Sequence, residues 1–180
     1  IVLAMRATGL VDFAEVGVYG RYVGVPNDPQ FSTQWNLRNL GQSGGTSDAD
    51  VDADEAWDIT GGDPSIVVAV IDSGTEYFHP DLAANIWSNT DEIPNNGVED
   101  DGNGFIDDTI GGDFEDGDNS PNTNFFHGTA VAGVVAAVGN NGIGIAGLAG
   151  GGDAGGGCSV MPLCVGESFP ISTVIDDAVL

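Results

Sequence analysis

The stretch SIVVAVIDSG, residues 65–74, decides the fold. Its centre is a short run of β-branched and aliphatic residues, and the turn formers Ser73 and Gly74 end it. Such a run predicts a parallel-sheet strand that is buried on both faces, with Asp72 where the strand meets the turn. In open α/β sheets, ligands and catalysis gather beyond the carboxyl ends of the strands. We therefore expect a catalytic Asp72, although an aspartate in this place can also simply cap the turn.

Helical and strand-like segments alternate along the rest of the chain. Four of them predict a short helix, a helix of small residues, a second buried strand and a last helix, at residues 51–62, 129–139, 159–165 and 168–180. Asp52 and Glu55 fit a capping box at the start of the first helix, and Gly61 fits its end. This alternation predicts an α/β fold with a parallel sheet.

The composition excludes several classes of function. The chain has 28 acidic residues against 3 basic ones, a formal net charge of −25 over 180 residues. This balance argues against a nucleic-acid partner, because little is present to neutralise phosphates, and it favours cation binding or a surface suited to salty water. We expect no membrane span, because no apolar run approaches about 18 residues. No signal peptide is visible after Ile1, and the chain reads as a piece of a longer protein.

The two cysteines give no information about the redox compartment. Cys158 and Cys164 flank the second predicted strand. An extended strand would separate them by about 20 Å, which is far beyond disulfide reach.

The segment FFHGTAVAG, residues 125–133, places His127 in the first turn of the small-residue helix. The positive helix terminus disfavours imidazolium, so the ring stays neutral and can act as a base. A buried carboxylate bound to one ring nitrogen would leave the other nitrogen facing a nucleophile. Asp72 is the candidate carboxylate; the alternative is a histidine that only caps its own helix.

Four motifs carry a family resemblance. VVAVIDSG, HPDL, HGTAVAG and VMPLCV, in this order, resemble the first half of a subtilisin-like serine protease, from about Asn27 to Leu180. The resemblance implies a three-layer α/β/α fold with a parallel sheet, incomplete because the C-terminal half is absent. It also implies that Asp72 orients the imidazole and that His127 is the general base, in the chain order Asp, His, Ser. Ala130 stands where many relatives have a second histidine, and Phe126 replaces the usual glycine, which could tighten or block that loop.

The same resemblance predicts how the chain is organised. Residues 1–25 are similar to the tail of an inhibitory propeptide, and residues 26–180 to the N-terminal half of the catalytic domain. We expect a maturation cut between Tyr22 and Asp28, polypeptide substrates, the chain's own propeptide as an intramolecular inhibitor, and a secreted enzyme. The nucleophilic serine is expected beyond residue 180, so we expect these residues alone to hydrolyse no peptide bond. We also expect the incomplete sheet to expose an apolar edge and to fold poorly in isolation.

The segment VEDDGNGFIDD, residues 98–108, lies in an acidic insert at about residues 88–118 and has the spacing of a calcium loop. Oxygen ligands on alternate residues suit Ca²⁺, and Gly104 falls where such a loop turns sharply. The predicted ligands are Glu99, Asp101, Asn103, the Phe105 carbonyl and Asp107. Ile110 cannot supply the usual final carboxylate, which Asp108 or Asp113 would replace. The alternative is a solvated acidic loop.

The resemblance implies a second calcium site. Its side-chain ligands would be Asp81 and Asn141, and the carbonyls of Val138, Ile143 and Ile145 would help.

Two other functions compete with this interpretation of the sequence. GIGIAG, residues 142–147, fits the G-x-G-x-x-G pattern of a dinucleotide-binding oxidoreductase, but the glycine-rich residues that follow cannot form the helix that this motif needs. A catalytically dead, calcium-binding relative is the other alternative, because the serine that would decide lies outside the chain.

Overall fold

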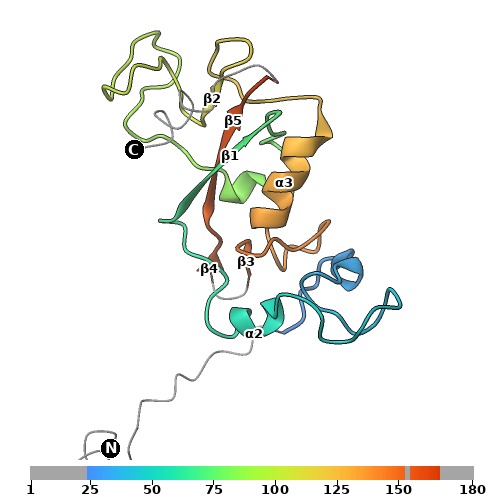
Figure 1. The fold of residues 1–180 in the computed structure, drawn as a ribbon. Helices are drawn as coiled ribbons and strands as arrows, with labels where there is room; N and C mark the ends of the chain where they lie inside the picture. The colour runs from blue at the N-terminus through green and yellow to red at the C-terminus, as the bar shows by residue number, and fades with distance from the viewer. Residues whose placement is uncertain (1–23, 153–154, 167–180) are drawn as a thin grey trace, which may run out of the picture.

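The computed structural model describes residues 24–152 and 155–166 (Figure 1). At its centre lie three parallel strands in the order β1–β5–β2. Their bounds are Val67–Asp72 for β1, Ser159–Cys164 for β5 and Gly112–Asp113 for β2. β1 and β5 pair along their whole length, with Asp72 opposite Cys164. Both predicted strands and their parallel pairing are confirmed. The helix expected at 168–180 and most of the segment 1–25 fall outside the described residues.

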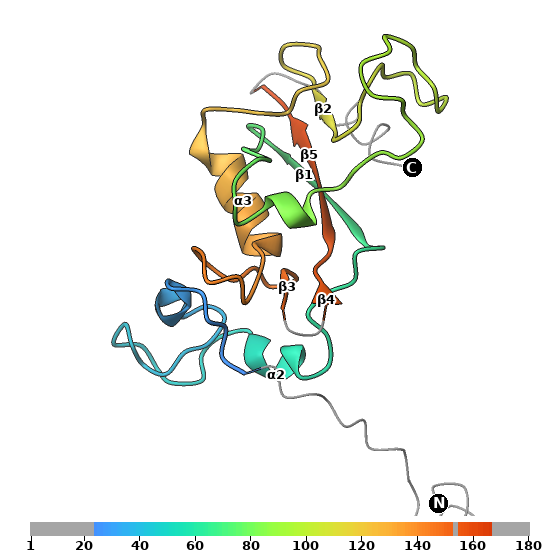
Figure 2. The same cartoon turned by 180° about the vertical axis from the view of Figure 1, so that it is seen from behind.

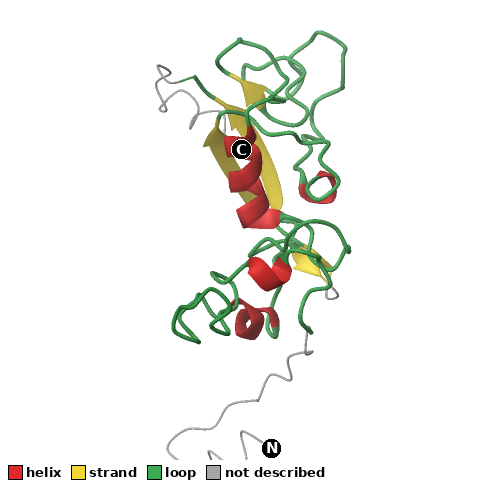
Figure 3. Cartoon of the chain, turned by 90° about the vertical axis from the view of Figure 1, so that its right-hand side faces the viewer, coloured by secondary structure: helices red, strands yellow, loops and turns green. Residues whose placement is uncertain are grey.

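Helix α3 (Phe126–Ala136) lies across one face of this sheet, as the side view shows (Figure 3). Helix α2 (Ala53–Trp57) lies beyond the amino ends of β1 and β5, near the short antiparallel pair β3 (Gly151–Gly152) and β4 (Gly155–Gly156) (Figure 2). Two single turns of 3₁₀ helix complete the described elements, η1 (Phe31–Thr33) and η2 (Ala83–Asn85). Among the described residues, none of the helices has the length and apolar character needed to cross a membrane.

The alternation of side chains along the strands builds a separate apolar cluster on each face of the sheet. Val70 of β1 and Val160 of β5 pack on Ala132 and Ala136 of α3. Because side chains alternate in a strand, Asp72 lies on the same face as Val70 and therefore meets α3. Small residues on α3 allow the helix to approach the sheet closely. The fold thus places the last residue of β1 beneath the first turn of α3.

Loop residues cover the opposite face of the sheet. Met161 and Leu163 of β5 are buried there against Trp87 and Phe114. Both covering residues come from the segment between η2 and α3, which is rich in Asp, Asn and Gly. This segment has a composition typical of exposed loops rather than of a core. It nevertheless contributes these aromatic side chains and several buried acids.

Two expectations about local structure were wrong. β1 is not buried on both faces: Val67 is 38% exposed and only Val70 is fully buried, because β1 is an edge strand that pairs with β5 alone among the described residues. The capping box at α2 does not form either. Asp52 adopts a left-handed φ of 52° and makes no side-chain cap, and its backbone N–H donates to Asp50 Oδ1. The helix begins after Asp52 as predicted but ends at Trp57, earlier than Gly61.

Candidate active site

Asp72 and His127 form a direct pair at the carboxyl end of β1. His127 Nδ1 lies 2.7 Å from Asp72 Oδ1 and 2.9 Å from Oδ2. An ionised carboxylate only accepts hydrogen bonds, so Nδ1 carries the proton and Nε2 holds the free lone pair. The Asp72 side chain is 17% exposed and the His127 side chain 69% exposed. The pair is therefore a shielded carboxylate that orients an accessible imidazole.

Further hydrogen bonds hold the Asp72 carboxylate in its ionised form. The Ser73 backbone N–H donates to Asp72 Oδ1 at 2.7 Å. Burial by itself would raise the pKa of Asp72, but the Ser73 N–H and the His127 ring together lower that pKa below its ordinary value. The Ser73 hydroxyl in turn accepts the Gly128 N–H at 3.3 Å, which ties the turn after β1 to α3.

A glycine–glycine contact sets how closely α3 approaches that turn. A Cβ on Gly128 would overlap the Gly74 carbonyl oxygen and lie 3.1 Å from Asp72 Cβ. Gly74 itself has a φ of 83°, and a Cβ there would lie 2.7 Å from the Pro121 carbonyl oxygen. Only glycine at both positions allows this approach, which brings the His127 ring within reach of Asp72.

A buried thiol packs beneath the same turn. Cys164 is 4% exposed, and its Sγ lies 3.2 Å from where a Cβ on Gly74 would be. Burial, together with the nearby Asp113 carboxylate, raises the pKa of Cys164 to about 12, so the thiol stays protonated. Cys158 and Cys164 are both free, as their predicted separation required.

Phe126 does not block the pair. It is the first residue of α3, and its ring is 81% exposed. The Asp72–His127 hydrogen bonds are formed beside it. The expectation that this residue could close the loop is therefore not met in the structure.

Comparison with known proteins assigns the chain to a family. A family model described as "Subtilase family" matches residues 63–157, which include both Asp72 and His127. The chain belongs to the subtilase family. The α/β architecture is that of an incomplete subtilase domain, as the sequence predicted. The dinucleotide-binding alternative finds no support, because residues 142–147 form bends and irregular backbone and no helix follows them in the described residues.

Individual relatives match different shares of this subtilase chain. Subtilisin-like protease 1 of Plasmodium vivax is 49% identical over 84 residues, 46% of this chain and 13% of that protein. Halolysin of Haloferax mediterranei is 32% identical over 140 residues, 77% of this chain and 21% of that protein. A crystal structure of an Aeromonas sobria serine protease with a chaperone superimposes with a TM-score of 0.54 at 27% identity, covering 77% of this chain and 20% of that one. The chain thus spans about a fifth or less of each of these proteins.

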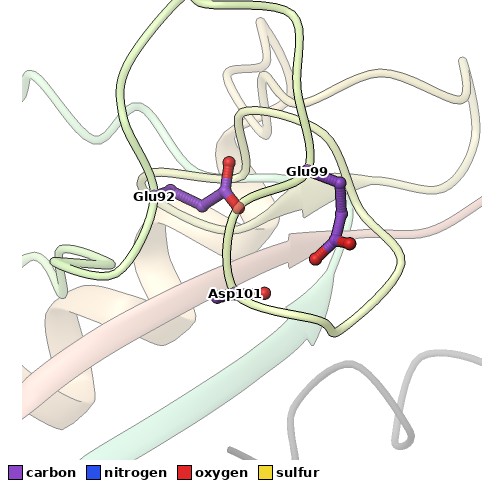
Figure 4. A group of neighbouring side chains, drawn as sticks. All are labelled: Glu92, Glu99 and Asp101. Carbon is purple, nitrogen blue, oxygen red and sulfur yellow. The ribbon is translucent and has the colours of Figure 1, made fainter.

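Three carboxylates converge in the acidic insert. Glu92, Glu99 and Asp101 each offer an oxygen within 4.8 Å of the others (Figure 4). Glu99 and Asp101 were predicted from the loop spacing. Glu92 was missed, because it lies seven residues before Glu99 and outside any calcium-loop register. Asn89 Nδ2 donates to Asp101 Oδ2 at 2.8 Å. This hydrogen bond is the main reason that the pKa of Asp101 is lowered, so the carboxylate is ionised.

Asn103 and Asp108 adjoin this cluster. Asn103 Nδ2 donates to Asp108 Oδ2 at 2.9 Å, while Asp108 Oδ1 is buried without a hydrogen-bond partner. Burial and the nearby Asp101 and Glu92 charges raise the pKa of Asp108. A buried, unpartnered carboxylate oxygen beside other acids is what a bound hard cation would satisfy. These residues fit a calcium ion.

Two other predicted side-chain ligands, Asp107 and Asp113, do not join the three carboxylates. The Asp107 carboxylate accepts the backbone N–H groups of Asn96 and Gly97, both at 3.0 Å, and so is engaged by another turn. Phe105 packs its ring against Phe114 at a centroid distance of 5.5 Å, and Asp113 accepts the N–H groups of the turn after β2. A carbonyl contribution from Phe105 stays a prediction.

The second predicted site is brought together in part. Asn141 Nδ2 donates to Asp81 Oδ1 at 2.8 Å, and the Ile145 N–H donates to Asp81 Oδ2 at 3.0 Å. Val138 donates its N–H to the Asp81 carbonyl, and Ile143 to Asn141 Oδ1. Asn141 and Ile145 therefore contact the buried Asp81 carboxylate directly, whereas Val138 bonds the Asp81 backbone and Ile143 bonds Asn141. The role of the three carbonyls as ligands stays a prediction.

Sequence reasoning also missed Asp28 at this second site. Its buried carboxylate accepts the backbone N–H groups of Asn140, at 2.9 Å, and Asn141, at 3.2 Å. Asp28 lies more than 100 residues from this loop in the sequence. No local spacing pattern could have indicated the contact.

Replacing Gly128 by alanine tests the glycine contact. We expect Gly128→Ala to lower the free energy of unfolding by about 1–3 kcal/mol, as overpacked sites do, and to weaken the His127–Asp72 hydrogen bond. Gly133→Ala is the matched control in the same helix, since its added Cβ meets nothing nearer than Ile145 Cδ1 at 3.5 Å. That variant should gain about 0.5–1 kcal/mol from helix propensity. Denaturant unfolding of the complete protein measures both, and equal effects would contradict the proposed contact.

The lowered pKa of Asp72 predicts a pH-dependent contribution to stability. A depressed pKa in the folded state stabilises the protein above the ordinary value of 3.8 and loses that effect as the pH falls through the folded-state pKa. Asp72→Asn should therefore be less stable than the wild type at pH 7, and this difference should shrink below about pH 4. Unfolding curves from pH 7 to pH 2 measure it, with Asp116→Asn as an exposed control. A difference that stays constant down to pH 2 would refute the assignment.

Proposed function

We propose that this chain is the N-terminal part of a serine endopeptidase that hydrolyses peptide bonds through an Asp72, His127 and Ser triad. The observation that carries the proposal is the 2.7 Å contact between His127 Nδ1 and Asp72, at the carboxyl end of β1. The serine would lie beyond residue 180, so the chain alone is inactive. Family membership and the exposed imidazole support this function, and no observation favours the catalytically dead relative.

The proposed mechanism gives each residue of the pair one task. Asp72 holds the Nδ1–H of His127, which leaves Nε2 as the base that takes the proton of the serine hydroxyl. The oxygen then attacks the carbonyl carbon of the scissile bond. His127 returns the proton to the leaving amine, and the Asp72 carboxylate stabilises the imidazolium that exists between the two transfers.

A serine-reactive probe and peptide hydrolysis test the proposal on the complete protein. We expect wild-type protein to be labelled and active, and His127→Ala to lose about 10⁴–10⁶-fold in turnover, as loss of a triad member does. Asp116→Asn, an exposed acid outside the pair, should keep the wild-type rate. Residues 1–180 alone should give no turnover. Failure of the complete wild-type protein to react with the probe would favour the calcium-binding relative without catalysis.

We further propose that Ca²⁺ binds in the acidic insert, held by Glu92, Glu99 and Asp101 with Asp108 and Asn103. The ion would order a loop that buries little apolar surface, and so would stabilise the native state. Asp81, Asn141 and Asp28 are proposed for the second site. An extracellular location accords with this use, because extracellular calcium modules bind at about 10⁻⁴–10⁻³ M.

Calcium-dependent stability tests the ligand set. At a hundred times its Kd, a single ion adds about 2.7 kcal/mol, so the melting temperature should rise with Ca²⁺ and fall with a chelator. Glu92→Gln and Asp101→Asn should each reduce this calcium-dependent increment. Asp107→Asn should keep it, because its carboxylate is engaged by Asn96 and Gly97. If Asp107→Asn removed the calcium-dependent increment and Glu92→Gln left it unchanged, the ligand set predicted from the loop spacing alone would be favoured instead.

We also propose that residues 1–25 act as the end of an inhibitory propeptide that is cut between Tyr22 and Asp28. The contacts of the following residues support this window. The Asn27 N–H donates to Asn140 Oδ1 at 2.9 Å, and Asn27 Oδ1 accepts the Gly142 N–H at 2.8 Å. Cleavage before Asn27 leaves these bonds intact, so the N-terminal sequence of mature enzyme should begin within this window.

A further inference from the structure

Three Asn-Gly dipeptides lie in loops of this chain, at residues 96–97, 103–104 and 141–142. An asparagine followed by glycine can modify itself without an enzyme, because glycine has no side chain that keeps its nitrogen away from the asparagine amide. Whether a given dipeptide reacts depends on how the local structure holds the two groups that must meet. One contact distinguishes the three dipeptides.

The asparagine side chains of the three dipeptides are held in the same way. Each Oδ1 accepts the backbone N–H two residues further along the chain at 2.7 Å, from Val98, Phe105 and Ile143. Each Nδ2 donates to an aspartate, Asn96 to Asp100 at 2.7 Å, Asn103 to Asp108 at 2.9 Å and Asn141 to Asp81 at 2.8 Å. Asn103 Nδ2 adds a longer contact with Asp101 Oδ2 at 3.3 Å. The side chains therefore do not separate the three sites.

The backbone N–H of the glycine does separate them. The Gly97 N–H donates to Asp107 Oδ2 at 3.0 Å, and the Gly142 N–H donates to Asn27 Oδ1 at 2.8 Å. Among the described residues, the Gly104 N–H has no hydrogen-bond acceptor. Gly104 is also exposed, and a Cβ built on it would meet nothing within 4 Å. Its nitrogen is therefore open to water and free to turn toward the Asn103 side chain.

The bonds that hold Asn103 lie within its own loop. Its N–H and Nδ2 donate to Asp101 and Asp108, and its Oδ1 accepts the Phe105 N–H. These partners are all within five positions of Asn103 in the sequence. The acidic insert thus sets the geometry of this dipeptide by itself.

We propose that Asn103 is a site of spontaneous deamidation and the first of the three asparagines to react. The Gly104 nitrogen loses its proton to hydroxide or water and attacks Asn103 Cγ, which forms a five-membered succinimide ring. The Cγ–Nδ2 bond breaks, and Nδ2 takes up a proton from water and leaves as ammonia. Water then opens the ring at one of its two carbonyl carbons, which yields aspartate or isoaspartate at this position.

At the other two dipeptides the glycine must first give up a hydrogen bond. Ring closure replaces the N–H by a bond from nitrogen to Cγ, so the acceptor loses its donor. Loss of a bond to a charged acceptor, as at Gly97, slows the reaction by about tenfold or more. Loss of a bond to a neutral acceptor, as at Gly142, slows it by about two- to tenfold.

The conversion would alter the proposed calcium site. It replaces the Asn103 Nδ2 donor by a carboxylate oxygen, so Asp108 Oδ2 loses this partner and faces a like charge. It also turns a neutral candidate ligand into a charged one. These consequences rest on the proposed calcium site, whereas the deamidation does not. Peptide masses test the deamidation and calcium-dependent melting tests the site, so the two proposals fail in different measurements.

Peptide mapping of the complete protein tests the proposal. The His127→Ala variant, which the proposed mechanism makes inactive, is incubated in its folded state at mildly alkaline pH. Samples are then digested, and mass spectrometry measures the conversion of each asparagine over time. We expect Asn103 to convert at least about tenfold faster than Asn96 and at least about twofold faster than Asn141. In denaturant the three rates should approach one another, because the contacts that separate them are lost.

Three further variants test the role of the glycine N–H. Asp107→Ala frees the Gly97 N–H together with that of Asn96 and should speed conversion of Asn96 by about tenfold. Asp100→Ala is the matched control, because it frees the Asn96 amide but leaves the Gly97 N–H bonded, and it should have a smaller effect. Asn27→Ala should likewise speed conversion of Asn141.

Two results would overturn the proposal. One is an Asn103 that converts no faster than Asn96 and Asn141 in the folded protein. The other is an unchanged rate at Asn96 in Asp107→Ala together with an unchanged rate at Asn141 in Asn27→Ala, since the glycine N–H would then not decide which asparagine reacts.

Discussion

The close approach of Gly128 to Gly74 is the constraint on which the rest of the structure depends. It lets the first turn of α3 sit directly on the turn after β1, where any side chain would overlap the backbone. The pairing of His127 with Asp72 and the bond between Gly128 and Ser73 both require that approach. The small residues further along α3 continue it, because they allow the helix to lie flat on Val70 and Val160. The geometry of the Asp72–His127 pair is thus a consequence of backbone contact.

Local patterns predicted the elements and the pair, but not the contacts that join distant segments. β1, β5 and α3 each follow from the composition of their own short segments, apolar runs for the strands and small residues for the helix, and Asp72 and His127 from their places at a strand end and a helix start. Glu92 and Asp28 were missed because their partners lie elsewhere in the sequence. Asp107 lies outside the three converging carboxylates, because alternate spacing places a residue in the loop without stating which way its carboxylate turns. The capping box failed since Asp52 took a left-handed conformation that spacing cannot reveal.

Acidic side chains stabilise this chain chiefly by accepting backbone hydrogen bonds. Among the described residues, Arg38 with Asp54 is the one ion pair between an arginine and an acid, at 2.8 Å. Buried acids such as Asp28, Asp81 and Asp113 instead accept N–H groups of nearby turns. A charged carboxylate is a strong acceptor, so it can organise loops that have little apolar surface to bury. Part of the large negative charge therefore belongs to carboxylates that hold the loops in place.

The buried Cys164 thiol can report local opening of the turn that follows β1. It lies opposite Asp72 in the sheet and packs beneath Gly74, where its raised pKa and burial keep the reactive thiolate scarce. A thiol reagent can modify it only after the turn has moved away from the end of β5. The rate of that modification then measures how often the end of β5 separates from the turn that follows Asp72, in a protein that remains folded elsewhere.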